Sequence, residues 1–175
     1  MNWAHIHLLL NHVPFFGALA GTIVLGVSVA QKRQGVARAG FMVIVLAALV
    51  AGAVFLTGEP AEDLVEDLPG VSTAVMEWHE EVALVSLIVL AAFALVALYG
   101  LVRFRDGVSL RYARAALLLS LLPLAAMAYT AYTGGQIRHS EVRPPALSES
   151  GKTGARQSAT PSTITERGSP ASRTA

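Results

Sequence analysis

Cysteine is absent from this sequence of 175 residues, and charged residues are scarce. Without cysteine the chain can form no disulfide, cannot bind an iron–sulfur cluster through thiolates and cannot attach a c-type haem covalently. Charged residues make up 14% of the chain, whereas they make up about 25% of a typical soluble domain. Phosphate-binding glycine loops and nucleic-acid-binding motifs are also missing, so we expect no nucleic acid partner.

Charge is missing above all from four apolar runs, each close to the ~20 residues that a helix needs to cross a bilayer. They predict membrane spans at about residues 8–30, 39–58, 80–102 and 114–134. The runs lack the alternation of a β-barrel strand. We therefore predict an all-α fold, an integral membrane four-helix bundle made by residues 1–142, with the lipid bilayer as its surroundings.

Prolines and glycines within these runs predict local features. Pro14 and Pro123 remove a backbone donor inside the first and fourth runs, so each should kink its helix. Gly17 and Gly21 form a GxxxG pair, which favours close packing against a neighbouring helix.

The loops between the runs differ in charge. Residues 31–38 and 103–114 are basic, whereas residues 59–81 contain eight acids and no lysine or arginine. The positive-inside rule places the basic loops in the cytoplasm. Both termini then lie on the outer, periplasmic side of a bacterial inner membrane. The basic residues Lys32 and Arg33 follow the first run instead of preceding it, which favours an uncleaved span over a signal peptide.

The tail, residues 143–175, is rich in serine, threonine, proline and glycine. Such a composition buries too little apolar surface to fold, so we predict disorder there.

All five histidines fall near the predicted outer face, and none lies in a basic loop. They are His5, His7, His12, His79 and His139. Histidines near the same end of several helices are typical of a bound haem or metal, because ligands in bundles come from facing helices. Ordinary interfacial or hydrogen-bonding use of each histidine is the competing interpretation.

A haem b needs two axial imidazoles on facing helices and no cysteine. His12 and His79 meet this requirement most simply. His5 shares a helical face with His12, and His139 follows a double glycine that could return the chain towards the site. Arg138 could pair with a haem propionate or an acidic loop residue, or act as an interfacial anchor.

A site for a copper, zinc or iron ion is the alternative, and it would recruit carboxylates as well. Its candidate ligands are His12, His79, His139, Glu59 and Glu80. The two glutamates could instead bond the second nitrogen of a ligating imidazole.

Four short motifs carry a resemblance to a known family. They are HIHLLLNHVP at residues 5–14, TGEP at 57–60, WHEE at 78–81 and TGGQIRH at 133–139. Together they resemble an uncharacterised family of bacterial four-helix integral membrane proteins, over about residues 2–142. Some members are fused to cytochrome c or Rieske modules. The resemblance implies membrane electron transfer and directs attention to His12, Glu59, His79 and His139.

These observations favour a b-type cytochrome-like electron-transfer subunit. Its expected partners are quinone and other membrane redox subunits or a periplasmic cytochrome. A non-haem metal-binding protein and a cofactor-free scaffold subunit of a respiratory complex remain alternatives. No nucleophile, base and orienting group are recognisable, so an accessory role is favoured over a stand-alone enzyme.

Overall fold

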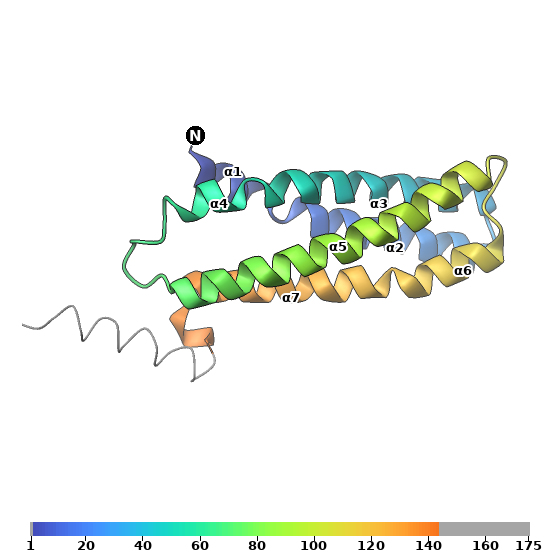
Figure 1. Cartoon of the computed structure of the whole chain (residues 1–175). Coiled ribbons are helices and arrows are strands. Elements are labelled where there is room, and N and C mark those ends of the chain that lie inside the picture. Colours follow the sequence, from blue (N-terminus) through green and yellow to red (C-terminus); the bar gives the residue numbers. More distant parts are fainter. Residues whose placement is uncertain (1, 144–175) are drawn as a thin grey trace, which may run out of the picture. The chain divides into compact units, whose positions relative to one another are not determined.

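The computed structural model describes residues 2–143, and the regular elements in that range are all helical. Figure 1 shows the long helices running side by side. The elements are α1 (Trp3–Leu10), α2 (Val13–Ala30), α3 (Gln34–Phe55), α4 (Gly58–Glu62), α5 (Thr73–Arg103), α6 (Leu110–Leu119), α7 (Leu121–Arg138) and the 3₁₀ turn η1 (Ser140–Val142). The predicted disorder of the tail concerns residues that, apart from Arg143, lie outside the described range.

Four helical stretches are long and apolar enough to cross a membrane. At ~1.5 Å per residue, the shortest covers about 33 Å, more than the ~30 Å of a hydrocarbon core. The predicted helical fold class and its four apolar helices are confirmed. The stretches are Trp3–Ala30, Gln34–Phe55, Thr73–Arg103 and Leu110–Arg138, with 28, 22, 31 and 29 residues.

Both predicted kinks are present as breaks between consecutive helices. α1 ends at Leu10 and α2 begins at Val13, one residue before Pro14. α6 ends at Leu119 and α7 begins two residues before Pro123. Each break lies within the turn that precedes the proline, where the ring would clash with the carbonyl four residues earlier.

The backbones of α2 and α3 approach each other closely at their glycines. A Cβ atom added to Gly21 would lie 2.9 Å from the carbonyl oxygen of Gly40, and one added to Gly17 would lie 2.9 Å from the Cβ of Ala47. The predicted role of the glycine pair in helix packing is therefore confirmed. The chain forms two helical hairpins, α1 and α2 with α3, and α5 with α6 and α7, which pack together mainly through α3 and α5.

The interior changes character along the helices. We call the end next to residues 59–81 the acidic end, and the end next to the loops at 31–38 and 103–114 the basic end. Phe41, Leu25 and Phe93 belong to an apolar core near the basic end, and a smaller apolar cluster surrounds Leu90 at mid-length. Towards the acidic end several of the buried side chains are polar. They include Ser72, Ser86, Thr133 and Gln136.

Candidate functional site

A half-buried histidine of the first hairpin bonds a threonine at the acidic end. Nδ1 of His7, on α1, lies 3.0 Å from the hydroxyl of Thr57, which follows α3. Thr57 donates its only hydroxyl proton to the carbonyl of Val54, at 2.6 Å, so towards His7 its oxygen accepts. Nδ1 of a neutral His7 must then carry the ring proton. The lone pair that can bind a metal therefore lies on Nε2.

The second hairpin repeats this arrangement. Nδ1 of His79, on α5, lies 3.0 Å from the hydroxyl of Thr133, on α7. Thr133 donates to the carbonyl of Thr130 at 3.0 Å. The proton of a neutral His79 is again fixed on Nδ1, and Nε2 again keeps its lone pair.

In both hairpins a glycine follows the threonine and lies beside the imidazole. A Cβ added to Gly134 would lie 3.0 Å from Cε1 of His79, and one added to Gly58 would lie 3.9 Å from Cε1 of His7. Only the first distance is too short for ordinary contact, so the His79 ring lies against the backbone of α7. The absence of a side chain at residue 134 makes room for this ring.

His7 and His79 both lie at the acidic end, one in each hairpin. They come from different hairpins, as axial ligands in a helical bundle do. In Figure 1, α1 and α4 lie above α5 and α7 at this end. We call His7, Thr57, His79 and Thr133 the histidine–threonine site.

A buried acceptor lies one turn deeper than His7. Asn11 donates its backbone N–H to the carbonyl of His7 at 2.8 Å, so the two residues occupy the same face of α1. Oδ1 of Asn11 is buried and has no hydrogen-bond partner among the described residues 2–143. Buried polar atoms are nearly always bonded, so this oxygen is available to accept a hydrogen bond from a bound group or a water.

Of the residues that the sequence singled out, His79 alone lies in the histidine–threonine site. The ring of His12 is exposed at the break between α1 and α2, and it makes no hydrogen bond within residues 2–143. His5 is exposed and bonds Asn2 at 2.6 Å, and exposed His139 pairs with Glu141 at 2.9 Å. The remaining candidates, Glu59, Glu80 and Arg138, are exposed as well.

Arg138 makes a structural contact. It donates to the carbonyl of Pro69 at 3.1 Å, and Arg143 donates to that of Gly70 at 2.7 Å. Both bonds hold the acidic loop to the end of α7. Within the described residues, no group of three or more histidines and carboxylates could hold a metal ion.

The sequence analysis included His7 among the five histidines but did not choose it as a ligand. The missed signal is a Thr–Gly pair at the end of the second helix of each hairpin. Thr57 follows His7 by 50 residues and Thr133 follows His79 by 54. Each pair joins the start of one helix to the end of the next, which is how antiparallel helices bring residues together.

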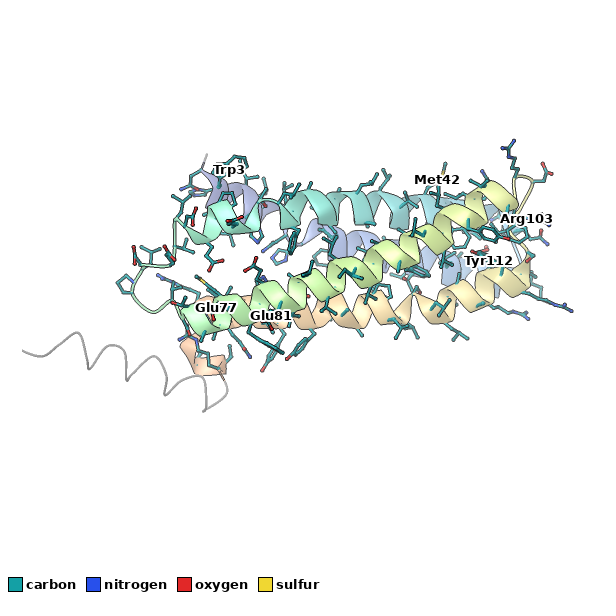
Figure 2. All side chains as sticks on the ribbon, in the orientation of Figure 1. Trp3, Met42, Glu77, Glu81, Arg103 and Tyr112 are labelled. Atoms are coloured by element: carbon teal, nitrogen blue, oxygen red, sulfur yellow. The ribbon has the colours of Figure 1, made fainter. Side chains whose placement is uncertain are left out.

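Carboxylates crowd the acidic end beside this site. Figure 2 shows Glu77 and Glu81 on the first turns of α5. Burial raises the pKa of Glu62, on α4, above its ordinary value, and the nearby charge of Glu80 raises it further. The fold therefore favours the protonated form of Glu62.

We expect Glu62→Gln to stabilise the protein at about pH 8 and to change little at about pH 4. A raised folded-state pKa contributes stability below the ordinary pKa of glutamate, and this contribution is lost as the pH rises through the folded-state value. Glutamine keeps the shape without the charge. Thermal unfolding in detergent, followed by circular dichroism, measures the effect. The exposed Glu59→Gln is the control, and a destabilised Glu62→Gln at about pH 8 would contradict the assignment.

The comparisons with known proteins give no relative from which a role could be carried over, and the family resemblance of the motifs stays a prediction. No family model matches the chain, and neither a curated protein nor a solved structure matches it.

Proposed function

We propose that this chain is a membrane-embedded b-type cytochrome-like electron-transfer subunit that binds haem b between His7 and His79. The observation that carries the proposal is the pair of Nδ1–threonine hydrogen bonds at 3.0 Å. Both bonds direct an Nε2 lone pair away from the threonine, which is the arrangement in which proteins bind metals through histidine. The first axial ligand is thus His7, in place of the His12 that the sequence favoured.

The number of donors favours haem over an isolated metal ion. A zinc site takes three or four ligands from the protein, and di-iron sites in bundles use several carboxylates. The described residues 2–143 hold no such group of three. Haem requires only axial ligands from the protein, because the macrocycle supplies the other nitrogens.

Two further observations support the fit. Gly134 leaves room for the imidazole of His79 against α7. Asn11 presents a buried acceptor with no partner among the described residues, one turn below His7. Such an acceptor suits a site that is completed by a bound group or an ordered water.

In the proposed function the chain's residues hold and insulate the centre. Thr57 and Thr133 fix the tautomer and orientation of the two rings, and their hydrogen bonds increase the basicity of Nε2. The apolar core around Phe41 and Leu90 fills the bundle from mid-length to the basic end, which keeps water from that side. When bound, haem supplies a one-electron iron couple whose potential depends on its axial ligands and surroundings.

The proposed orientation places the acidic end outside the bacterial inner membrane. The loops of the basic end carry lysines and arginines, and short loops of this kind stay in the cytoplasm. Both termini and the histidine–threonine site then lie on the periplasmic side. The family resemblance supports the same location, since fused cytochrome c or Rieske modules would meet the chain there. We propose a periplasmic cytochrome or another membrane redox subunit as the partner.

An absorption spectrum of the detergent-purified protein, combined with elemental analysis, tests the proposal. We expect a Soret band that sharpens and shifts on reduction, and iron in an amount equal to the haem. A colourless protein containing zinc, copper or non-haem iron would support a metal-ion site and overturn the haem assignment. A colourless protein without metal that co-purifies with other membrane subunits would indicate a scaffold.

Gly134→Ala should weaken haem binding by about tenfold or more, in the range found when outer-shell partners of a metal site are lost. The added methyl group would lie 3.0 Å from Cε1 of His79 and push the ring away from Thr133. Haem titration of the purified variants measures the effect. Gly135→Ala is the matched control, because nothing lies within 4 Å of its added Cβ. Equal affinities for the two variants would contradict the placement of His79.

A further inference from the structure

The two hairpins resemble each other beyond their histidine–threonine pairs. Each returning helix, α3 in the first hairpin and α6 with α7 in the second, carries the residues Ala-Arg-Ala near its start, at 37–39 and 113–115. A Thr-Gly pair follows at the same spacing in both, at 57–58 and 133–134. Corresponding positions between these motifs are buried in both helices. They are Ala37 and Ala113, Gly40 and Ala116, Ile44 and Ser120, and Ala47 and Pro123.

The leading helices, α1 with α2 and α5, correspond as well. One constant offset superimposes their buried positions and places Arg33 on Arg105, in the basic loop that follows each helix. Burial alone recurs with the turns of a helix, and the position of the loop selects this offset. The longer loop between α5 and α6 gives the returning helices a slightly larger offset. The matched buried residues are Pro14 and Ser86, Ala18 and Leu90, Gly21 and Phe93, Leu25 and Ala97, and Ser28 and Gly100.

This register singles out one histidine of the first hairpin. The offset that matches the buried faces places His7 on His79. His5 and His12 fall opposite a glutamate and a leucine. The matched buried positions do not include the histidines, so the register is a second reason, independent of the threonine bonds, for pairing His7 with His79.

Packing between the hairpins follows a twofold rule. α3 packs on α5, and α2 packs on α6 and α7, so the leading helix of each hairpin contacts the returning helix of the other. A twofold axis requires this exchange, because each contact must occur twice. Figure 1 shows α5 crossing from α7 at the acidic end towards α3 at the basic end. Both hairpins start at the acidic end, so the axis runs along the bundle, as in membrane proteins built from parallel repeats.

We propose that the chain is a tandem duplication of one helical hairpin and that the haem lies on the pseudo-twofold axis between the copies, with its plane parallel to the helices; the position of the haem rests on the proposed function. A twofold rotation that exchanges two axial ligands must have its axis in the plane of the macrocycle, because the ligands lie on opposite sides along the normal. The plane therefore stands perpendicular to the membrane surface. One edge of the macrocycle then faces the outer solution, from which a soluble redox partner would approach.

Electron paramagnetic resonance of the haem-containing full chain in oriented membrane multilayers tests the orientation of the plane. The largest g value of a low-spin haem lies along the normal of the macrocycle. We expect its signal to be strongest when the magnetic field lies in the membrane plane and nearly lost when the field is perpendicular to it. A signal that is strongest with the field along the membrane normal, or that does not depend on the angle in well-ordered multilayers, would overturn the proposal.

Distances between spin labels test the twofold axis without haem. The chain has no cysteine, so labels attach only at introduced ones. Ala20 and Ala92 are corresponding exposed positions of the leading helices, and Ala39 and Ala115 are those of the returning helices. The axis exchanges the pair Ala20 and Ala115 with the pair Ala92 and Ala39. The two double cysteine variants, Ala20→Cys with Ala115→Cys and Ala92→Cys with Ala39→Cys, should therefore give superimposable distance distributions. Distributions with clearly different means would show that the hairpins are not related by such an axis.

Together the two experiments separate this inference from the proposed function. A low-spin haem whose plane lies parallel to the membrane keeps the cytochrome function and removes the haem from the axis. A haem-free protein with equal label distances loses the cytochrome function and the haem position, but keeps the duplicated hairpin. Unequal label distances overturn the duplication whether or not haem is bound.

Discussion

We expect His7→Ala and His79→Ala each to lower the haem content of the purified protein by more than about tenfold, because either change removes a proposed axial ligand. Loss of an outer-shell partner alone typically costs a metal site ten- to a hundred-fold in affinity. Thr133→Val, which keeps the shape of the side chain and removes the acceptor for His79 Nδ1, should therefore have a smaller effect than His79→Ala. The pyridine haemochrome assay, normalised to protein, measures all three variants.

The other histidines provide the controls for this prediction. His12→Ala and His5→Ala should have the same haem content as the wild-type protein, since both residues are exposed. His139→Ala should do the same, because its ring pairs with Glu141 at the surface. If His12→Ala lost haem while His7→Ala kept it, the axial pair would be His12 and His79, and the site derived from the threonine bonds would be wrong.

Gly21→Ala should destabilise the protein by about 1–3 kcal/mol, the usual cost of overpacking a tight interior. The added methyl group would lie 2.9 Å from the carbonyl oxygen of Gly40. This neighbour is backbone, which cannot turn away as a side chain would. α2 and α3 would have to separate at their closest approach, and the first hairpin would lose its packing. Thermal or denaturant unfolding in detergent measures the change.

Gly52→Ala is the matched control for this change. Gly52 lies on α3 as well, and nothing lies within 4 Å of its added Cβ. Alanine favours a helix over glycine by about 1 kcal/mol, so this variant should be equal to the wild type or slightly more stable. Equal stability of Gly21→Ala and Gly52→Ala would show that the α2–α3 crossing is looser than the structure has it.

The four apolar helices could be predicted from the sequence because run length and loop charge are local properties. The same holds for the breaks before Pro14 and Pro123, since each follows from one missing backbone donor. The helix limits were less predictable. α5 begins at Thr73 and so includes the charged turn around Glu77, because a helix can continue past the apolar segment into water.

The proposed axial pair could not be predicted in the same way. Placing His12 on the face of His5 assumes one uninterrupted helix, but α1 ends at Leu10 and α2 begins only at Val13. The face of His7 continues to Asn11 and stops there. The threonine partners were equally hidden, because their contacts depend on how two antiparallel helices align and not on any spacing within one of them.

Electron paramagnetic resonance of the oxidised wild-type protein tests the central claim, two histidines from two hairpins on one haem, most directly. The account predicts the low-spin ferric signal of bis-imidazole haem in the wild type, and its replacement by a high-spin signal in whatever haem His7→Ala retains. A wild-type protein that contains haem but gives a high-spin signal, or a low-spin signal that persists in His7→Ala, would contradict it.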